Sequence, residues 1–416
     1  MPNTKQAFPA PQKGREQAKP IAISLFSGAG GLDLGFLYAG FEIPIAVEIN
    51  KQAAYTYAQN LGAKIIKADT PLEEVNFGET VVVWDDIKKV KGQWLLALYT
   101  KITGAPQVAA LLGGPPCQSW SFGGNREGKA DVRGQLIYEY LRLLCEVAPQ
   151  TFLFENVKGI ISKRFLPVFL DLCEEFSRLG YDVQYELLNS YNYGVAQTRE
   201  RVFIVGQKTN AKKFSFPPQV SYKLVLKDII GDLPQPQPYQ KEAGQIYAVP
   251  KEITAVKSRR SCFIPNPTPM SPDDNPKDGR VLIRQGMIIP VEGLKQDVVA
   301  NHEEMEFGFS SRYLSRNRQR QWHQPGFTIV CSGKQQALYP DPVFDVRTLA
   351  RLEKYPPKGT IPRRLTVREC MRIQSFPDWF ILYGTLQAQY QQVGNAVPVV
   401  LGYCLGQQLK ACLALA

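Results

Sequence analysis

The chain has 416 residues and a formal net charge of +11, and 44% of its residues are hydrophobic. This length and composition are typical of a globular protein with a large core and about two or three domains. No run approaches the roughly 18–20 consecutive apolar residues of a membrane span, and residues 1–20 contain no apolar signal segment. These features argue against a membrane protein and favour a cytoplasmic location.

The positive charge is concentrated in the second half of the chain. Residues 1–206 contain 21 basic and 21 acidic side chains, whereas residues 207–416 contain 28 basic and 17 acidic ones. Within that half, residues 207–364 hold 25 of the basic and 15 of the acidic side chains. A neutral part joined to a basic part indicates that one binds a small ligand and the other a polyanion.

The cysteines and histidines limit the possible chemistry. The eight cysteines form no C-x-x-C pair, and His302 and His323 are the only histidines. The cysteine spacing argues against a zinc site, and reduced thiols in the cytosol are the simplest interpretation. We therefore expect no metal site. A thiol protease is disfavoured, because both histidines lie in the basic half.

Residues 1–20 are rich in Pro, Gln and Lys and are expected to form a flexible tail. From residue 21 to residue 206, short apolar runs alternate with helical patterns, which predicts an α/β domain with a parallel sheet covered on both faces. The expected strands are Ile21–Phe26, Ile43–Ile49, Val81–Trp84, Gln107–Leu112, Thr151–Phe154 and Val202–Val205. The expected helices are Leu32–Ala39, Lys51–Asn60, Trp94–Lys101, Gln135–Val147 and Phe165–Leu179.

The composition and periodicity of the sequence change after Gly206. Residues 207–364 are basic and interrupted by proline clusters, which predicts a second, smaller, loop-rich domain. Helical patterns return at Thr366–Gln374 and Val397–Leu413. We expect this C-terminal segment, 365–416, to pack back on the first domain.

Ligands of an open α/β sheet bind at the carboxyl ends of its strands. The first expected strand ends at Phe26, and Gly28, Gly30 and Gly31 follow in a turn that brings backbone amides close to a ligand. Asp33 occupies the third glycine position of the dinucleotide fingerprint. The turn therefore favours a smaller or less anionic ligand than a dinucleotide, and a structural glycine turn is the alternative.

Two further strand ends carry acids. Glu48 ends the second expected strand, where a carboxylate can accept hydrogen bonds from ribose hydroxyls. Asp86 and Ile87 follow another apolar run and can offer an acceptor to an exocyclic amine beside an apolar wall. Ordinary surface acids are an equally good interpretation of either position alone.

Cys117 follows Gly-Gly-Pro-Pro at another strand end, so a stiff turn presents its thiol. The loop 118–134 is rich in glycine and contains Arg126, Lys129 and Arg133. Nearby cations lower the pKa of a thiol and favour the nucleophilic thiolate. The alternative is a small buried hydrophobic residue. That alternative better describes Cys145, Cys173, Cys404 and Cys412.

Glu155 follows the apolar run Thr151–Phe154, and partial burial there would raise the pKa of its carboxyl and allow it to donate a proton. Gln197, Arg199 and Arg201 enter the last strand with a two-residue period and should share one face. Exposed strand charges are usually solvated, but convergence on the strand ends that carry Cys117 and Glu155 favours a site.

Together these residues resemble the DNA (cytosine-5) methyltransferase family, from Ile21 to about Leu409. Six segments occur in the order found in that family, and the length resembles that of its bacterial restriction-modification members. The six are Phe26–Gly31, the Pro-Pro-Cys-Gln loop, Glu155–Val157, Gln197-x-Arg199-x-Arg201, Arg364–Pro377 and Gln392–Val397. The resemblance implies a Rossmann-like methyltransferase sheet in a catalytic domain over 21–206 and a smaller, loop-rich target-recognition domain over 207–364.

The resemblance also implies that the small ligand is S-adenosyl-L-methionine. The residues that would bind it are Phe26, Gly28, Gly30, Gly31, Glu48, Asp86, Ile87, Pro116, Leu136, Asn395 and Val397. Ile49 departs from the family pattern, because many relatives have an aromatic residue there that stacks on the adenine.

By the same resemblance, the Cys117 thiolate adds to C6 of a cytosine, Glu155 assists at N3, and the activated C5 accepts the methyl group. The cytosine must be flipped out of the duplex, because the stack hides C6. Arg199 and Arg201 would hold the base and its phosphates while loop 118–134 closes. The expected DNA-binding residues are Gln118, Ser121, Asn156, Gln197, Arg312, Arg316, Arg318 and Arg320.

Sequence-specific methylation of duplex DNA is thus the leading hypothesis. The resemblance further implies functional pairing with a restriction endonuclease of the same specificity, a monomeric state, and a bacterial cytoplasmic location on the nucleoid. Two alternatives remain open at this point. One is a tRNA cytosine-5 methyltransferase, and the other is a catalytically silent DNA-binding module.

Overall fold

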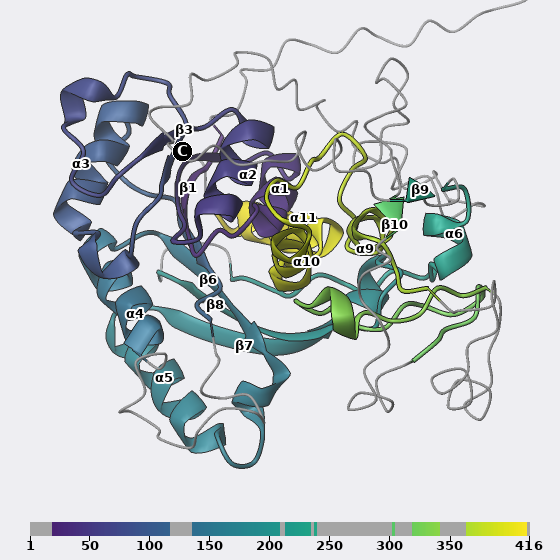
Figure 1. Ribbon diagram of the computed structural model, residues 1–416. Helices are drawn as coiled ribbons and strands as arrows, with labels where there is room; N and C mark the ends of the chain where they lie inside the picture. Colours follow the sequence, from purple (N-terminus) through teal and green to yellow (C-terminus); the bar gives the residue numbers. More distant parts are fainter. Residues whose placement is uncertain are drawn as a thin grey trace, which may run out of the picture.

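The computed structural model describes residues 19–116, 135–208, 213–233, 237–238, 302–303, 318–341 and 363–413 (Figure 1). In these ranges one eight-stranded sheet has the order β3-β4-β2-β1-β5-β6-β8-β7. Its strands are β1 (Ile21–Leu25), β2 (Glu42–Val47), β3 (Lys64–Ile66), β4 (Val81–Val83), β5 (Ala110–Gly113), β6 (Thr151–Val157), β7 (Asp182–Asn189) and β8 (Glu200–Gln207). A separate parallel pair joins β9 (Gln237–Pro238) to β10 (His302–Glu303).

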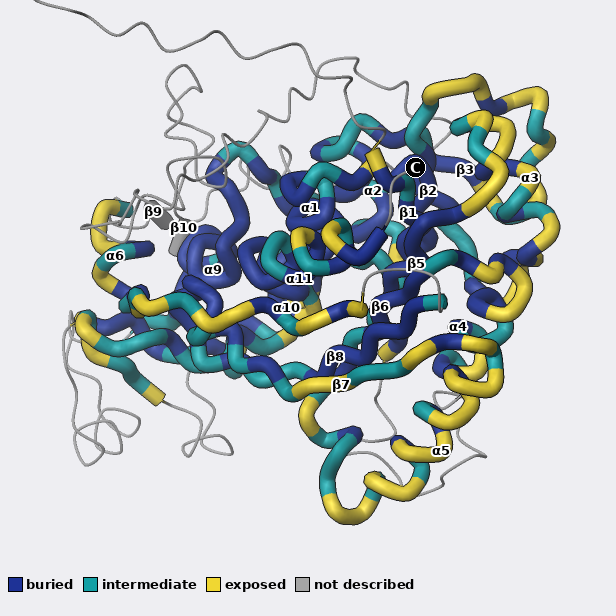
Figure 2. The backbone as a smooth tube through the Cα atoms, turned by 180° about the vertical axis from the view of Figure 1, so that it is seen from behind, coloured by how far each residue is buried: buried dark blue, intermediate teal, exposed yellow. Residues whose placement is uncertain are grey.

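Helices cover both faces of the sheet. The helices of the described residues are α1 (Gly31–Tyr38), α2 (Lys51–Leu61), α3 (Gly92–Thr103), α4 (Gln135–Val147), α5 (Leu166–Arg178), α6 (Leu226–Ile230), α9 (Val367–Ile373), α10 (Leu386–Asn395) and α11 (Val399–Cys412). Of these, α6, α9 and α10 pack in a separate core cluster with α1 and α11. Alternate strand residues supply the two layers of core. Ile23 and Leu25 pack with side chains of α3, α4 and α5, whereas Ala22 packs with those of α1 and α11. Figure 2 shows the central strands as buried backbone.

The expected α/β class is confirmed, but the sheet is not wholly parallel. β8 runs antiparallel to both β6 and β7. Residues 190–199 between β7 and β8 form a short 3-10 turn, Ser190–Tyr193, and an extended entry to β8. A parallel connection needs a crossover of a dozen or more residues, so this short link returns the chain in the opposite direction.

The C-terminal segment lies against the start of the chain. α11 packs along α1, so the two ends of the described chain lie side by side in Figure 1. The approach is close, because a Cβ on Gly35 would stand 2.5 Å from the backbone nitrogen of Tyr403. This contact completes the core beneath β1 and brings the residues just before α11 next to the turn after β1.

None of the helices in the described part of the chain combines the length and the apolar character needed to cross a membrane. Only short pieces of 207–364 are described, so the division into domains stays a prediction. The described piece 318–341 joins the segment that leads into β8 through a bridge between Gln197 and Gly326.

Candidate active site

A cavity of about 580 Å³ lies at the carboxyl ends of β1, β2, β4, β5 and β6. The start of β8 and the segment between α10 and α11 complete its wall. Ten of the eleven predicted cofactor residues line it, together with Glu155, Arg199, Arg201 and Asn156. The topology therefore brings residues separated by more than 350 positions in the sequence into one site.

The turn after β1 forms one wall of the cavity. Phe26 adopts a φ of 55° and Gly28 a φ of 56°, which are left-handed conformations that reverse the chain tightly. Gly31 lies against the α10–α11 link, because a Cβ there would stand 2.6 Å from the carbonyl oxygen of Val397. Gly30 does not line the cavity; it precedes α1 and faces the ring of Tyr57. Its predicted cofactor contact therefore stays a prediction that the lining of the cavity does not support.

Glu48 lies directly after β2 and is buried. Its Oε2 accepts a 2.8 Å hydrogen bond from the backbone N–H of Gly28, and its Oε1 accepts a 2.7 Å bond from that of Asn50. Burial raises the pKa of Glu48, and these backbone donors oppose the shift. A carboxylate has about four lone-pair positions, so Glu48 keeps acceptor capacity for ligand hydroxyls beside its backbone donors.

The next wall follows β4. Asp86 accepts a 3.0 Å hydrogen bond from the backbone N–H of Lys88, which orients the start of a short 3-10 helix at Ile87. Ile49 lies across the cavity and is 62% exposed. Its carbonyl accepts a 3.2 Å bond from the indole of Trp84. An apolar side chain thus occupies the wall where relatives were expected to have an aromatic one.

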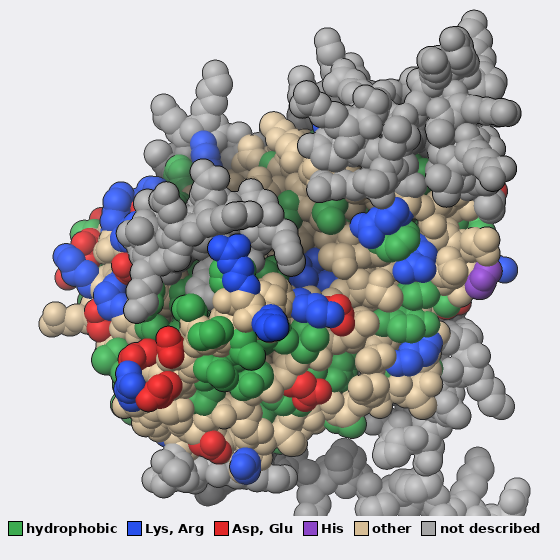
Figure 3. Space-filling view, turned by 90° about the horizontal axis from the view of Figure 1, so that it is seen from below, with side chains coloured by type: hydrophobic (Ala, Val, Ile, Leu, Met, Phe, Trp, Pro, Cys, Tyr) green, Lys and Arg blue, Asp and Glu red, His purple; other side chains and the backbone are tan. Residues whose placement is uncertain are grey.

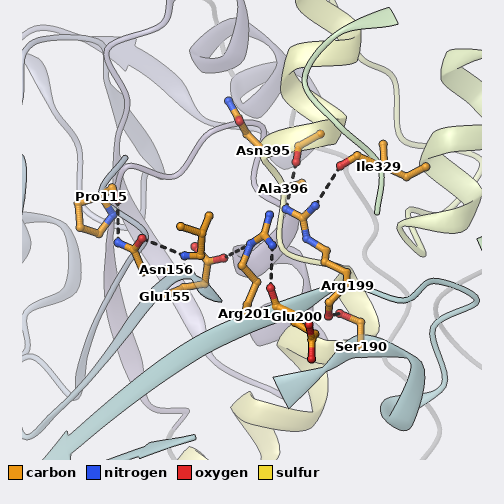
Figure 4. Close-up of polar contacts among 12 residues, drawn as sticks. Pro115, Glu155, Asn156, Ser190, Arg199, Glu200, Arg201, Ile329, Asn395 and Ala396 are labelled. Carbon is orange, nitrogen blue, oxygen red and sulfur yellow. Dashed lines mark hydrogen bonds and ion pairs between the residues drawn. The ribbon is translucent and has the colours of Figure 1, made fainter. Parts of the chain in front are cut away.

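The catalytic end of the cavity lies between β6 and β8. The Nε atom of Arg201 is 3.0 Å from the Oε1 atom of Glu155 (Figure 4). Burial raises the pKa of Glu155, although the positive charges of Arg201 and Arg199 oppose the shift. Gly114 leaves room for this carboxylate, because a Cβ there would stand 2.9 Å from the Oε2 atom of Glu155. β6 extends to Val157, so Glu155 belongs to the strand rather than following it.

Asn156 forms a hydrogen bond with the backbone just before the predicted nucleophile, Cys117. Its Nδ2 donates a 3.2 Å hydrogen bond to the carbonyl of Pro115, and the side chain is buried (Figure 4). Pro116, the next residue, lines the cavity and is exposed. The predictions for Cys117, Gln118 and Ser121 lie outside the described residues. Asn156 therefore acts on the loop backbone, at a position two residues before Cys117.

Arg199 and Gln197, which were expected to contact DNA, form hydrogen bonds within the protein instead. Arg199 is 1% exposed, and its guanidinium donates to the carbonyls of Ile329 and Gly394 at 3.1 and 3.0 Å (Figure 4). Burial lowers its pKa to about 9, which still leaves it charged at neutral pH. Gln197 is fully buried, donates to Gln374, accepts from the backbone N–H of Ile329, and does not line the cavity.

Two of the four predicted DNA-binding arginines are described. The guanidinium carbons of Arg318 and Arg320 lie 4.4 and 4.0 Å from the ring centre of Phe327. Stacking uses the face of a guanidinium and leaves N–H groups at its edge for phosphate. Neither residue lines the cavity, and the predictions for Arg312 and Arg316 lie outside the described residues.

Three cavity features were missed by the sequence reasoning. Cys331 lines the cavity, and its thiol donates to Oδ1 of Asn395 at 2.7 Å. Gln392 lines it with a buried Oε1 that has no hydrogen-bond partner. Asp33 also lines it and is fully buried. Asp33 had a signal in the sequence, since an acid stands where the dinucleotide fingerprint has glycine; Cys331 had none.

The charges that line the cavity are segregated. The acids near the turn after β1 lie at the β4, β2 and β1 side of the sheet, whereas the arginines lie at β8, on the other side of β5. The acids on the first side are Asp33, Glu48, Asp85 and Asp86. No Lys, Arg or His lines that side within the described ranges. An acidic pocket with unused acceptors suits a cationic nucleoside such as S-adenosylmethionine, so the residues present fit this cofactor.

Comparisons with known proteins agree with this geometry. The family model for C-5 cytosine-specific DNA methylases matches residues 21–411. The Type II methyltransferase M.FnuDI of Fusobacterium nucleatum is 38% identical over 397 residues, covering 94% of each chain. M.MthTI of Methanothermobacter thermautotrophicus is 39% identical, covering 93% of this chain and 96% of its own.

The solved structure of DNMT2 from Spodoptera frugiperda shares the fold. Its TM-score is 0.56 at 17% identity, covering 94% of this chain and 99% of that one. The family model and the curated relatives confirm the leading hypothesis from the sequence, and they do not favour the tRNA and silent-module alternatives. The chain belongs to the C-5 cytosine-specific DNA methylase family, whose members use S-adenosylmethionine to methylate C5 of cytosine in DNA.

Proposed function

We propose that this protein is the modification enzyme of a Type II restriction-modification system and methylates a flipped-out cytosine in a short duplex sequence. The observation that carries the proposal is one cavity that joins an acidic cofactor end to the Glu155–Arg201 pair, with Pro116 at its wall immediately before Cys117. Relatives named as Type II methyltransferases match along most of their length, which supports the same biological role.

At the cofactor end, Glu48 would accept the ribose hydroxyls, and Asp86 with Ile87 would flank the adenine. The Phe26–Gly31 turn, Leu136, Asn395 and Val397 would enclose the rest of the molecule. When bound, S-adenosylmethionine supplies an electrophilic methyl group. The enclosure matters chemically, because a cavity that excludes water strengthens every electrostatic contact inside it.

At the catalytic end, Cys117 would add to C6 of the cytosine and leave again when C5 loses its proton. Glu155 would protonate or hydrogen-bond N3, and its raised pKa favours the protonated form that this role needs. Arg201 would hold Glu155 in place through the 3.0 Å contact. Arg199 would act through the backbone of residues 329 and 394 rather than on the base.

A labelled methyl-transfer assay tests this proposal. Wild-type protein should transfer the methyl group of S-adenosylmethionine to duplex DNA, and Cys117→Ser and Cys117→Ala should abolish the transfer. Cys145→Ala is the matched control, since that cysteine is exposed, contrary to the buried position expected from the sequence, and does not line the cavity. DNA containing 5-fluorocytosine should form a covalent adduct with the wild type, because fluorine at C5 blocks elimination. Turnover by both Cys117 variants would contradict the mechanism.

The biological pairing needs its own test. We propose that the protein works as a monomer in the bacterial cytoplasm, on the nucleoid, beside an endonuclease of the same specificity. Bisulfite sequencing of DNA from a host that expresses the protein should show methylation of one cytosine within one short motif. That DNA should then resist an endonuclease that cuts the motif. Methylation without sequence context would argue against this role.

A further inference from the structure

Phe327 is half-buried, yet it belongs to none of the hydrophobic core clusters that the described residues form. Two arginines lie against its ring instead. The guanidinium carbons of Arg318 and Arg320 are 4.4 and 4.0 Å from the ring centre. A guanidinium that stacks on an aromatic face keeps the N–H groups of its edge available to an acceptor. We call these three residues the arginine platform.

Nothing in the described part of the chain neutralises the two arginines of the platform. No carboxylate of the described ranges pairs with either one, and the Nε atom of Arg320 is buried without a hydrogen-bond partner. Arg363 shows the contrast: it stacks on Tyr339 at 3.4 Å, but its guanidinium also donates two hydrogen bonds to Glu369. Two like charges held against one ring repel each other. The platform is therefore suited to an acceptor from outside the protein.

The backbone of the platform is anchored to the rest of the described chain. The carbonyl of Arg318 accepts a 2.9 Å hydrogen bond from the N–H of Leu338. A turn, closed by a 3.0 Å bond from the N–H of Gln324 to the carbonyl of Gln321, then leads the chain toward Phe327. The arginines and the ring that they contact are thus ordered before any ligand arrives.

The platform is joined to the catalytic end of the cavity. Before Phe327, the carbonyl of Gly326 accepts a 2.9 Å hydrogen bond from the N–H of Thr198. After it, the hydroxyl of Thr328 donates to the carbonyl of Thr198 at 2.7 Å. The chain continues from there into β8, where Arg201 contacts the predicted catalytic carboxylate at 3.0 Å. The arginines therefore have a defined position relative to the place where the cytosine would react.

DNA must pass close to this end of the cavity, because a flipped-out cytosine stays attached to its duplex. We propose that Phe327 is a positioning residue that holds the Arg318 and Arg320 guanidiniums ready to donate to acceptors of bound duplex DNA. These acceptors are phosphate oxygens or the O6 and N7 atoms of guanine. The inference rests on the proposed action on duplex DNA. Phe327 acts through the two arginines and need not touch the DNA itself.

The ring contributes to affinity by ordering the guanidiniums in advance. An arginine side chain has many rotamers, and fixing it only on binding costs affinity. Stacking removes part of that freedom in the free protein. Loss of the ring at unchanged charge should therefore weaken DNA binding by roughly tenfold. Binding of S-adenosylmethionine should not change, because Phe327 does not line the cavity.

The first experiment is a double-mutant cycle on the full chain, with DNA dissociation constants measured by fluorescence anisotropy at constant salt. Phe327→Leu should weaken binding roughly tenfold in the wild type, and hardly at all when Arg318 and Arg320 are both replaced by alanine. Phe327→Tyr keeps a ring and should bind within about twofold of the wild type. Equal losses from Phe327→Leu in both backgrounds would assign the residue to the fold alone and overturn the proposal.

Phe77→Leu is the matched control for this substitution. Phe77 is 73% exposed, does not line the cavity, and has no described cation stacked on its ring. Its DNA affinity should equal that of the wild type. The dissociation constant of S-adenosylmethionine, measured for every variant, checks that the cavity is intact.

A second set of variants leaves the ring and its packing in place. Arg318→Lys combined with Arg320→Lys keeps both charges but removes the planar groups that stack and donate in pairs. This protein should bind DNA roughly tenfold more weakly than the wild type, and adding Phe327→Leu should then change little. Wild-type affinity with the two lysines would overturn the proposal, whether or not Phe327→Leu folds.

Two duplexes distinguish the acceptors, one with the methylated motif and one without it. If the arginines bind phosphates, Phe327→Leu weakens binding to both duplexes equally. If they bind guanine edges, the loss is confined to the duplex with the motif, and either result supports the positioning role. Failure of the proposed function is seen separately. A wild type that methylates duplex DNA beside an equally tight-binding Phe327→Leu variant would contradict only the role of Phe327.

Discussion

Glu155 has a carboxyl whose pKa is raised by burial and which contacts the guanidinium of Arg201. Replacement by glutamine keeps the shape of the side chain but removes its proton. We expect Glu155→Gln to lower kcat by about 10²–10⁴-fold, the usual contribution of a general acid. The raised pKa of Glu155 gives the sign of the pH dependence: in the wild type the Glu155-dependent rate should fall as pH rises through that pKa.

In Glu155→Gln the methyl-transfer rate should not show this decrease as pH rises. Single-turnover methyl transfer across a pH series measures both effects. Wild-type rates in the variant would show that the carboxyl does not act on the base.

The burial of Asp33 also predicts a change in stability. Its pKa is about 6 in the folded chain, against 3.8 as its ordinary value. The stability that it contributes is therefore complete below about pH 4 and is lost as pH rises through 6. At pH 7.5 without cofactor, Asp33→Asn should raise the free energy of unfolding by up to ~3 kcal/mol.

Urea unfolding at pH 4.5 and 7.5 measures this difference. Glu48 and Glu155 shift in the same direction, so the comparison is made between variant and wild type, in which their contributions cancel. A variant that is less stable than the wild type at pH 7.5 would contradict the assignment.

Ile49 offers a test of the cofactor wall. It lines the cavity with 62% of its surface exposed, where an adenine-stacking aromatic residue was expected. Ile49→Phe should tighten S-adenosylmethionine binding by about 2–10-fold, as expected for an added aromatic contact of ~0.5–1.5 kcal/mol. Equilibrium titration measures the dissociation constant. No change would mean that the adenine does not contact this wall.

Among the elements, β8 with the residues 197–199 that lead into it and the segment 326–331 depend on one another. Gln197 joins Gln374 and Ile329, and Arg199 joins Ile329 and Gly394, all within buried surroundings. Gln197→Leu would leave two buried polar groups unpaired. We expect it to lower the free energy of unfolding by about 2–5 kcal/mol.

Gln93→Leu, on the exposed face of α3, serves as the control in urea unfolding and should have little effect. If Gln197→Leu left stability unchanged and abolished DNA binding, the residue would contact DNA, as the sequence suggested, instead of fixing the wall of the cavity.

Most elements were predictable because they are strongly apolar or strongly periodic. The buried strands β1, β2, β4, β5, β6 and β8 and the helices α1 to α5, α9 and α11 match the expected segments to within a few residues. β7 was missed because it is the edge strand of the sheet and mixes exposed with half-buried residues without a regular two-residue alternation. α10 was missed because its many glutamines hide the apolar periodicity of a buried helix. Gln392 is nevertheless buried, and its side chain donates a hydrogen bond to the carbonyl of Tyr383.

The site residues were predictable where a polar side chain lies at the carboxyl end of an expected strand. Glu48 lies near the end of the expected strand Ile43–Ile49, and Asp86 lies just beyond the expected strand Val81–Trp84, so topology alone brings them together. Asp33 and Cys331 were not recognised as site residues, because their positions depend on contacts between segments. Cys331 meets Asn395 across 64 residues of sequence, and no local pattern encodes that contact.

At the scale of the whole molecule, charge guides the approach of DNA. Figure 3 shows Lys and Arg side chains near the middle of the face that it draws. The net charge of +11 resides chiefly in residues 207–364. Binding should weaken steeply with salt, with a slope of about −0.9 per phosphate contact.

If Arg318 and Arg320 contact phosphates, alanine at either position should reduce that slope by about one. Arg178→Ala is the control, because Arg178 pairs with Glu174 and Glu175 on the surface of α5. Fluorescence anisotropy over a salt series measures the slopes. Unchanged slopes in both variants would place these two arginines away from the DNA backbone.

We propose that this protein transfers a methyl group to C5 of cytosine in DNA by way of Cys117. The most direct measurement is transfer of labelled methyl from S-adenosylmethionine to duplex DNA, followed by digestion and identification of the labelled nucleoside. The wild type should yield 5-methylcytosine as the labelled product, and Cys117→Ala should yield none. Label in another base, or undiminished labelling by Cys117→Ala, would contradict it.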